Sequence, residues 1–478
     1  MKRLISLLLA VIIALSVSIS CFAAEKCSCD IEPVVFVHGF GTHPLYLNYG
    51  EKDQRQVFPP DTKAIVESMP DILSLLFNLT VTKNYDRAAD DLNSIADKML
   101  GYLACDENGN SKYNVGIEHH DLPTEDHHKG TDYSFTVFNG EQADKDQYLF
   151  YYDFRIDPVD AAKQLKEYVN HIKKLTGHNK VKIACHSEGN TVVSSYLYLY
   201  GCKDVSRVIF LSPAYKGLSL IGNMLIGNVT LNDKKNPLFL YFEQMLGINP
   251  RNYFEELIIN SVRDYGLYPN LFNALDEFFD AEFDYVFYTK LTEIFCTMPC
   301  IWAFCPDEYY KSAKAHVFGN DSKYKTFIDK IDYYHYNVQC NLEKTLNKCL
   351  KNGMTLAICC GYNISSIPIV DGAETQSDML IDTEYMSIGA RCADIGTTLK
   401  ATIKNKYFSP DLLVDASTCL YPEYTWFIKN QMHSQFTKGY EKFVTELLLC
   451  KSQPTLSNMK QYQQFMVNDK NENLIPVK

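Results

Sequence analysis

Apolar residues occur along the chain in short continuous runs that alternate with segments of helical spacing. The run Val34–Val37 ends at a glycine-rich turn and predicts a buried strand. Asp157-Pro158 predicts a helix start, and apolar positions at helical spacing continue to Leu175, before Gly177. Further strands are predicted at Tyr148–Phe154, Val181–Cys185, Val208–Leu211, Met354–Cys360 and Tyr424–Lys429. This alternation predicts an α/β fold, with a mostly parallel sheet covered by helices on both faces.

The alternation stops after residue 216, and the next good strand begins only at Met354. Such an interval is too long for a simple loop and predicts a largely helical cap over residues 217–345, inserted before a late core strand. Seventeen of the 66 residues from Phe239 to Phe304 are aromatic, against 13% in the whole chain. These side chains form either the core of a helical subdomain or a cap that lines an acyl-chain pocket. Gly217–Leu231 is rich in Leu, Ile and Gly and is a candidate lid.

The first residues have the pattern of an export signal. Lys2 and Arg3 precede the apolar run Leu4–Val17, and Ala23 and Ala24 follow. This order predicts a signal peptide over residues 1–24 and a secreted or extracytoplasmic protein. The remaining chain divides into a first core part at 25–216, the cap at 217–345, a second core part at 346–450 and a C-terminal tail at 451–478.

Composition limits the partners and the compartment. The 478 residues carry a formal charge of −12, which disfavours nucleic acid as a partner because that polyanion recruits cationic surfaces. Any contact with a lipid interface is expected to be apolar and transient. The 16 cysteines are many for a reduced cytosolic enzyme and predict disulfide bonds in an oxidising compartment, although their pairing and the oligomeric state stay open.

The sharpest motif is Cys185-His186-Ser187-Glu188-Gly189, which lies between a predicted strand and a predicted helix. A strand–turn–helix elbow holds a serine in a strained conformation with its hydroxyl above the sheet, and small neighbours let the turn pack. Ser187 is therefore the predicted nucleophile, as opposed to a chance serine in an ordinary turn.

A serine nucleophile needs backbone donors for the oxyanion that forms on its substrate. One donor is expected at the amide of Glu188, directly after the nucleophile and at the start of the next helix. The other is expected from the loop after an early strand, where His38-Gly39-Phe40-Gly41 makes the Phe40 amide the candidate.

These motifs resemble α/β-hydrolase serine lipases and esterases, in particular the lecithin:cholesterol acyltransferase-like group. The resemblance covers the Val-His-Gly-Phe-Gly and His-Ser-Glu-Gly motifs, Tyr152-Asp153-Phe154-Arg155 and Leu211-Ser-Pro-Ala-Tyr-Lys-Gly217. It extends over residues 32–217 and 354–435 and is weak between them. The family implies acyl transfer by a triad in the order Ser, Asp, His.

After Ser187 the chain contains three histidines, and only His433 follows the last predicted core strand, where this fold needs its base. The acidic member of the triad has four candidates, because two similar segments contain Asp378, Asp382, Asp411 and Asp415. Pro410–Asp415 leads directly to His433 and resembles the Asn-Asp-Gly-x-Val segment of secreted lipases, which implies Asp411. Leu412 replaces the glycine of that pattern, so Asp415 is the second choice and the earlier segment the third.

The sequence thus predicts a secreted serine hydrolase that cleaves carboxylic esters of lipids through Ser187, Asp411 and His433. The alternatives are a lipid acyltransferase with the same acyl-enzyme and an inactive hydrolase-like binding protein. No cofactor and no metal are expected. Glu118-His119-His120-Asp121 and Asp126-His127-His128 contain metal-ligand residue types, but their spacing follows no metal motif and favours a solvated loop.

Overall fold

The computed structural model describes residues 31–118, 122–123, 147–229, 267–370, 373–400 and 406–478. The predicted signal peptide and the histidine-containing stretch from His119 lie outside these residues, apart from Leu122 and Pro123.

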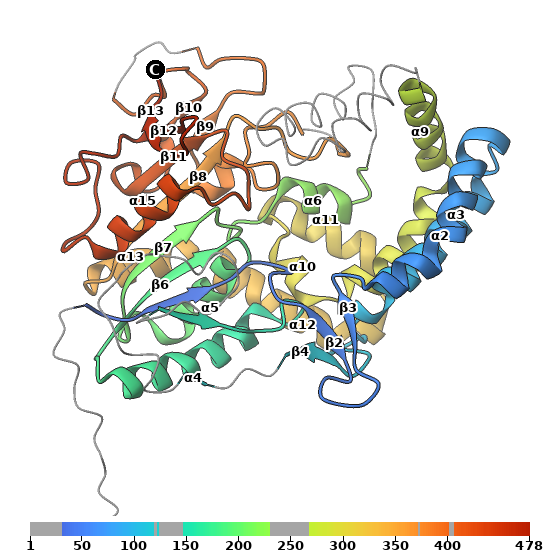
Figure 1. Cartoon of the computed structure of the whole chain (residues 1–478), viewed down its shortest axis with the longest axis horizontal. Coiled ribbons are helices and arrows are strands. Elements are labelled where there is room, and N and C mark those ends of the chain that lie inside the picture. Colours follow the sequence, from blue (N-terminus) through green and yellow to red (C-terminus); the bar gives the residue numbers. More distant parts are fainter. Residues whose placement is uncertain (1–30, 119–121, 124–146, 230–266, 371–372, 401–405) are drawn as a thin grey trace, which may run out of the picture.

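The centre of the molecule is an eight-stranded sheet with the order β13-β12-β11-β8-β7-β6-β1-β5 (Figure 1). All neighbouring strands are parallel except the pair β12 and β13, so the predicted mostly parallel α/β sheet is confirmed. In sheet order the strands span Leu474–Pro476, Phe465–Asn468, Thr425–Lys429, Thr355–Tyr362, Val205–Leu211, Val181–His186, Val34–Val37 and Gln147–Phe150.

Helices cover both faces of this sheet, as the apolar strands predict. On one face Val35 and Val37 pack with helices α4 (Pro158–Thr176) and α5 (Gly189–Tyr200). On the other face Val34 packs with α15 (Lys438–Leu449). The predicted boundaries of α4 hold, because the Asp157 side chain accepts a hydrogen bond from the Val159 amide and Gly177 ends the helix at a φ of 71°.

The segment between β7 and β8 is largely helical in its described residues, as predicted for a cap. It contains α6 (Ser219–Leu225), α9 (Leu267–Val286), π-helix η5 (Phe287–Cys296), α10 (Pro299–Ala303), α11 (Asp307–Phe318), α12 (Lys325–Tyr333), π-helix η7 (Tyr334–Gln339) and α13 (Leu342–Lys351). Leu218 donates a backbone hydrogen bond to the Phe304 carbonyl, which ties the start of this segment to its middle.

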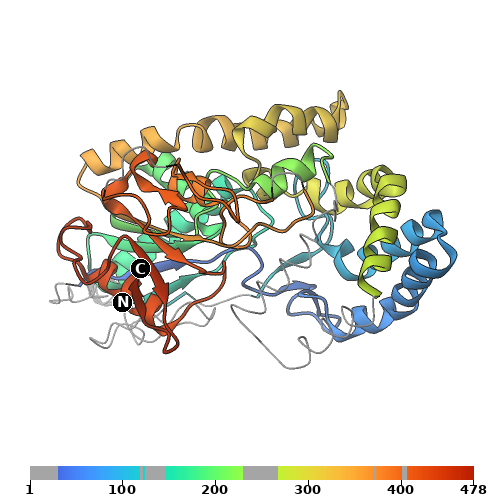
Figure 2. The same ribbon diagram turned by 90° about the horizontal axis from the view of Figure 1, so that it is seen from above.

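A second segment adds to the cap from the N-terminal side. Helices α2 (Thr62–Phe77) and α3 (Tyr85–Leu100) stand beside α9 at one end of the molecule, away from the sheet (Figures 1 and 2). Leu79, Ala88 and Phe278 form a small separate core there. The predicted division of the chain places α2 and α3 in the first core part at 25–216. In the structure they pack on α9, which belongs to the inserted segment.

Three short strands connect this helical pair to the core. Strands β3 (Arg55–Phe58), β2 (Leu45–Leu47) and β4 (Val115–Ile117) form a separate sheet with antiparallel pairing. The buried Arg155 guanidinium donates to the carbonyls of Leu103 and Val115 at 3.3 and 2.9 Å, and so joins this sheet to the start of α4.

The predicted C-terminal tail is wrong in its second half, because β12 and β13 extend the central sheet. Phe465 in β12 stacks on Phe427 in β11, with ring centroids 5.3 Å apart, and is buried. These strands are short, and their apolar alternation is brief, so the sequence pattern did not distinguish them from a tail.

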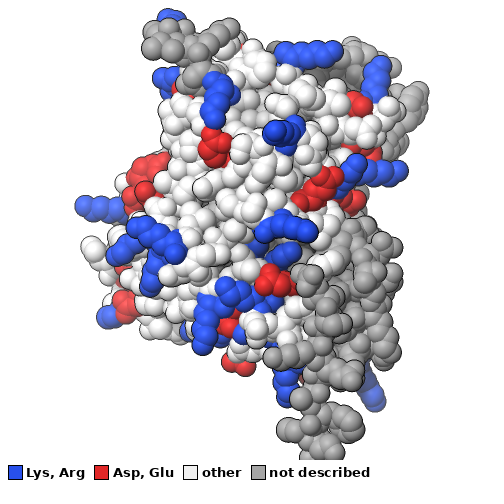
Figure 3. Space-filling view, turned by 90° about the vertical axis from the view of Figure 1, so that its left-hand side faces the viewer, with Lys and Arg blue, Asp and Glu red and all other residues white. Residues whose placement is uncertain are grey.

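The predicted disulfide bonds do not occur among the described residues, where every cysteine is free and most are buried. Cys185, Cys359 and Cys360 lie in central strands, where their side chains fill the core as small apolar groups. On the face drawn in Figure 3, basic and acidic side chains are interspersed across broad uncharged areas.

Candidate active site

Ser187 lies in a tight turn between β6 and α5, as the elbow motif predicts. Its φ is 54°, a left-handed conformation that is strained for a residue with a side chain. Gly189 permits the turn, because a Cβ atom at this position would come within 2.2 Å of the Val37 carbonyl oxygen. The local sequence therefore fixes the serine at the end of β6, next to the turn that follows β1.

His433 and a carboxylate complete a hydrogen-bonded chain with Ser187. The His433 Nε2 atom lies 2.8 Å from Ser187 Oγ, and its Nδ1 atom lies 2.7 Å from Asp378 Oδ2. All three side chains are buried. The arrangement has the order of contacts required for a nucleophile, its base and the acid that orients the base.

The Asp411 prediction is corrected by this geometry. Asp411 pairs with Lys429 at 2.8 Å and accepts a hydrogen bond from the Tyr362 hydroxyl at 3.2 Å, whereas Asp378 contacts His433. Asp415, the second choice, pairs with Arg391 at 3.0 Å. Both aspartates thus have cationic partners elsewhere. The sequence offers one sign that Asp411 pairs elsewhere. Lys429 ends the strand before His433 and is a cationic partner for Asp411.

Asp378 reaches His433 because the backbone comes close at two points. The His433 amide donates to the Asp378 carbonyl at 2.8 Å. Gly361, in β8, leaves the room for this contact, since a Cβ atom there would lie 2.6 Å from both Asp378 Cβ and the Gln431 carbonyl oxygen.

The environment of Asp378 keeps its carboxylate ionised. Burial would raise its pKa, but His433 and the amides of Ile381 and Leu380 outweigh burial and lower it below the usual value. The His186 ring lies beside the pair of His433 and Asp378, and its Nε2 atom donates a hydrogen bond to the His433 carbonyl at 2.8 Å. Burial, followed by the proximity of His433, lowers the pKa of His186 to about 3, so it stays neutral and holds the loop of His433 in place.

The two predicted oxyanion donors lie next to Ser187. Gly39 precedes Phe40, and a Cβ atom on Gly39 would lie 3.3 Å from Ser187 Oγ. Glu188 is the N-cap residue of α5. Neither the Phe40 amide nor the Glu188 amide donates a hydrogen bond to any residue that the structure describes. Both amides are thus available to a ligand, as an oxyanion hole requires.

An apolar cavity of about 310 Å³ opens at Ser187. It is lined by Phe40, Ser187, Ala214, Leu218, Ile221, Met224, Leu225, Phe287, Phe295, Cys296, Ile301, Phe304, Leu380 and Ile381. Half of these residues come from α6, η5 and α10, and with Leu218 and Phe304 the cap supplies most of the wall. The predicted lid region is represented here by α6, while its last two residues, Thr230 and Leu231, lie outside the described residues.

The segment from Asp378 to Asp382 serves both the triad and the cavity. Asp378 contacts His433, and Leu380 and Ile381 line the cavity. Asp382 accepts hydrogen bonds from the Ser219 amide at 2.9 Å and the Ser219 hydroxyl at 2.7 Å, at the start of α6. This short segment therefore provides the carboxylate that contacts His433, part of the cavity wall and the attachment of helix α6.

Comparisons with known proteins add little to this geometry. No protein-family model matches the chain. No curated protein matches it. Among solved structures, a chain of the Tle4–Tli4 complex is similar at 14% identity and a TM-score of 0.21, over 41% of this chain and 48% of that chain. This chain thus spans about half the length of that neighbour, and at that TM-score the likeness carries no argument.

Proposed function

We propose that the protein is a serine hydrolase of the α/β-hydrolase fold that cleaves carboxylic esters of lipids. The observation that carries the proposal is the chain Ser187–His433–Asp378, with contacts of 2.8 and 2.7 Å at the mouth of an apolar cavity. Transfer of the Ser187 proton to His433 is useful for catalysis only if a substrate carbonyl reaches Ser187 Oγ, and the cavity provides that access.

In the proposed reaction, His433 Nε2 takes the proton of Ser187 Oγ as the oxygen attacks the ester carbonyl. The amides of Phe40 and Glu188 donate hydrogen bonds to the oxyanion and so stabilise the negative charge that develops on the carbonyl oxygen in the transition state. His433 then protonates the leaving alcohol, and an acyl-enzyme remains on Ser187. Water activated by His433 releases the fatty acid, while Asp378 stabilises the imidazolium in both steps.

The cavity supports an acyl chain as the group next to Ser187. Its volume of about 310 Å³ lies at the lower end of the ~300–1,000 Å³ range of ligand pockets. Apart from the Ser187 hydroxyl, its lining side chains are aliphatic or aromatic, except for the thioether of Met224 and the thiol of Cys296. A charged or strongly polar acyl group would lose its hydration there without gaining partners.

A fluorophosphonate probe tests the nucleophile. We expect the wild-type protein to be labelled and to hydrolyse a medium-chain acylglycerol, and the Ser187→Ala variant to do neither. The Ser417→Ala variant is the matched control, because Ser417 lies outside the cavity in the short 3-10 helix Ala416–Thr418. Labelling that is absent, or that persists in Ser187→Ala, contradicts the proposal.

Analysis of the products separates hydrolysis from acyl transfer to an alcohol. With phosphatidylcholine as donor, a hydrolase releases free fatty acid whether or not a sterol or long-chain alcohol is present. A transferase converts the same donor into an acyl ester once the alcohol is added. We expect free fatty acid in both reactions.

A lipid ester is presented by an interface, and helix α2 offers a surface for contact with one. By length and composition alone, the described segment Thr62–Thr82 could cross a bilayer. Apolar side chains line its outer face and are exposed at Ile65, Val66, Met69, Leu73, Leu76, Phe77 and Val81. Because the charged residues Lys63, Glu67 and Asp71 interrupt this segment, we propose that it lies along the lipid surface with its apolar face toward the acyl chains.

Export is proposed on the N-terminal pattern alone. Mass spectrometry of protein recovered outside the cytoplasm of its host tests it, with cleavage expected near Ala24.

A further inference from the structure

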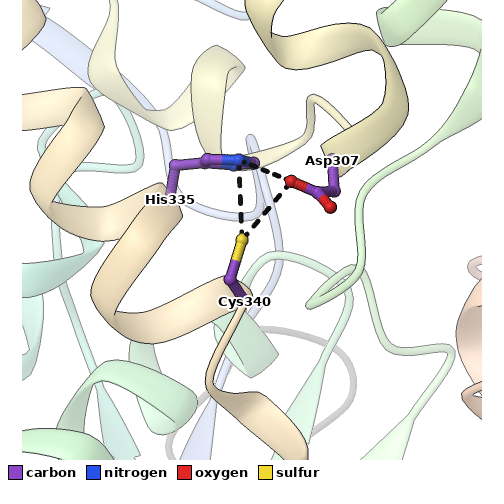
Figure 4. Close-up of side chains that lie close together, drawn as sticks. All are labelled: Asp307, His335 and Cys340. Carbon is purple, nitrogen blue, oxygen red and sulfur yellow. Dashed lines mark hydrogen bonds and ion pairs between the residues drawn. The ribbon is translucent and has the colours of Figure 1, made fainter.

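A second cluster of reactive side chains lies in the cap, apart from Ser187. Asp307 begins α11, His335 lies in η7, and Cys340 follows η7 directly (Figure 4). Asp307 Oδ1 is 3.0 Å from His335 Nε2 and 3.5 Å from Cys340 Sγ, and Sγ is 3.6 Å from Nε2. The three ligand-type atoms thus form a small triangle in which His335 is buried and the other two residues are exposed.

The tautomer of His335 is fixed by Gln339. The Gln339 amide nitrogen donates to the Ala303 carbonyl at 3.2 Å, so its oxygen faces His335 Nδ1 at 2.7 Å. Because an amide oxygen only accepts, Nδ1 carries the proton. In neutral His335, Nε2 is therefore an unprotonated acceptor aimed at the Asp307 carboxylate, which is also an acceptor.

Two acceptors 3.0 Å apart require a positive charge or a proton between them. The ring cannot turn away, because it stacks on Tyr310 with ring centroids 3.6 Å apart and planes at 5°. A bound cation resolves the conflict and uses the thiol as well.

The spacing of the three atoms fits a tetrahedral metal ion. With metal–N and metal–O distances of ~2.0–2.1 Å and a metal–S distance of ~2.3 Å, tetrahedral angles place N and S about 3.5 Å apart and N and O about 3.3 Å apart. The observed separations of 3.6 Å for N and S, 3.5 Å for S and O, and 3.0 Å for N and O match these values with little movement.

We infer that Asp307, His335 and Cys340 form a binding site for Zn²⁺, with water in the fourth position. A nitrogen, a thiolate and a carboxylate suit this ion, and a hydrogen bond to the far nitrogen of a ligating histidine is the usual support for such a site. The exposure of Asp307 and Cys340 leaves room for the water and an entry path.

The site joins separate parts of the cap. Asp307 starts α11, which packs on the cavity-lining helix α6, and Phe304, three residues earlier, lines the cavity itself. His335 and Cys340 belong to the helical segment that runs on to α13 and β8. A metal ion here holds the cavity wall to the segment that enters the central sheet.

Cobalt(II) tests the site in the purified full chain, treated first with chelator and kept reduced with a phosphine. We expect one equivalent of Co²⁺ to give a thiolate-to-cobalt charge-transfer band, which Zn²⁺ then abolishes. The band reports a cysteine ligand, so ions held by the histidines near His119 do not contribute to it. Cys340→Ser removes the band, and Asp307→Asn weakens Co²⁺ binding by at least about tenfold.

Cys450→Ser is the matched control, because Cys450 is a partly exposed thiol at the end of α15, and this variant keeps the band. As a second readout, Zn²⁺ raises the unfolding temperature of the wild type and of Cys450→Ser, but not that of Cys340→Ser. The inference is overturned if the wild type gives no band or if Cys340→Ser retains both responses. Since Ser187→Ala leaves the cluster intact, its Co²⁺ spectrum is expected to equal that of the wild type, whatever the outcome of the hydrolase tests.

Discussion

Asp378 is the residue on which the orientation of His433 depends. It holds the Nδ1 side of the ring at 2.7 Å and accepts two backbone hydrogen bonds of its own, from Leu380 and Ile381. An amide in its place presents a donor to Nδ1 and favours the wrong tautomer.

We therefore expect Asp378→Asn to lower kcat by about 10⁴-fold while the protein keeps its fold. Asp411→Asn is the matched control, since Asp411 pairs with Lys429 and not with His433, and its activity should stay within a few-fold of the wild type. Steady-state kinetics on a soluble ester and circular dichroism of both variants provide the comparison. Equal losses in the two variants would contradict the assignment.

Glu188 has a buried side chain that finds no hydrogen-bond partner within the described part of the chain. Burial, and then the charge of Asp153, raises its pKa well above the usual value of 4.5. The folded protein therefore holds a proton that the unfolded chain releases at lower pH. Its contribution to stability is complete below pH ~4.3 and is lost as the pH rises toward the raised value.

Glu188→Gln removes this titration while leaving the backbone amide in place. We expect the free energy of unfolding of the wild type to fall relative to that of the variant between pH 4 and pH 8. The loss is at most about 1.4 kcal/mol per pH unit. Urea unfolding at several pH values measures it, and parallel stability curves for the two proteins would exclude the buried acid as the cause.

Much of the candidate site is predictable from the sequence at this scale. Ser187, His433 and the two backbone donors follow from local patterns, because an elbow and a glycine-rich turn are encoded by adjacent residues. The acid does not follow in this way. Asp378 and Asp411 both lie on the connection between β8 and β11, and the partner of each depends on how that long connection folds.

Helix α6 forms one wall of the cavity, and Met224 is a lining residue of this helix that is only partly buried. A larger side chain at this position reduces the cavity without overfilling the protein core. We expect Met224→Trp to lower kcat/KM for long-chain esters by about tenfold or more relative to acetate or butyrate esters. Leu199→Trp, on α5 and away from the cavity, is the control, and an unchanged chain-length profile in Met224→Trp would exclude α6 from the acyl site.

The exposed face of α2 gives a prediction about lipid surfaces. Leu73 and Phe77 are 61% and 54% exposed, so their substitution costs the fold little. We expect the double variant Leu73→Ser, Phe77→Ser to bind phosphatidylcholine vesicles at least about tenfold more weakly while it hydrolyses a soluble ester normally. Leu449→Ser, at an exposed apolar position on α15, should bind vesicles as the wild type does. Equal vesicle sedimentation of all three proteins would count against the contact.

Elements with a strong period were predictable, and those defined by distant contacts were not. The apolar strands and α4 follow from their own sequences. The association of α2 and α3 with α9 depends on the contact of Leu79 and Ala88 with Phe278, which lies 190 residues after Ala88 (278 − 88) and shares no local pattern with them.

In the whole molecule, the two C-terminal strands close one side of the central sheet. Without β12 and β13 the edge of β11 would offer unpaired amides and carbonyls to other chains. Gln464, next to β12, donates to the carbonyls of Pro422 and Thr425, which extends the attachment beyond the strands themselves.

Phe465→Ala is therefore expected to lower the free energy of unfolding by about 3–5 kcal/mol, as for a buried aromatic residue of the core. Ile475→Ala, at a position in β13 that is 38% exposed, should cost less than about 1 kcal/mol. Denaturant unfolding of the two variants decides whether this end of the chain belongs to the folded core. A negligible loss for Phe465→Ala would mean that it does not.

The segment from Asp378 to Asp382 limits how the protein could be re-engineered. Chain-length selectivity altered at Leu380 or Ile381 also disturbs the residue that orients His433, so specificity and turnover are expected to change together. The opposite wall, built by α6 and η5, has no such link to the triad within its own residues, apart from the attachment of Ser219 to Asp382. For the proposed lipid-ester hydrolysis, new acyl specificities are therefore best sought on that wall, where the shape of the cavity is adjustable separately from the contacts of His433.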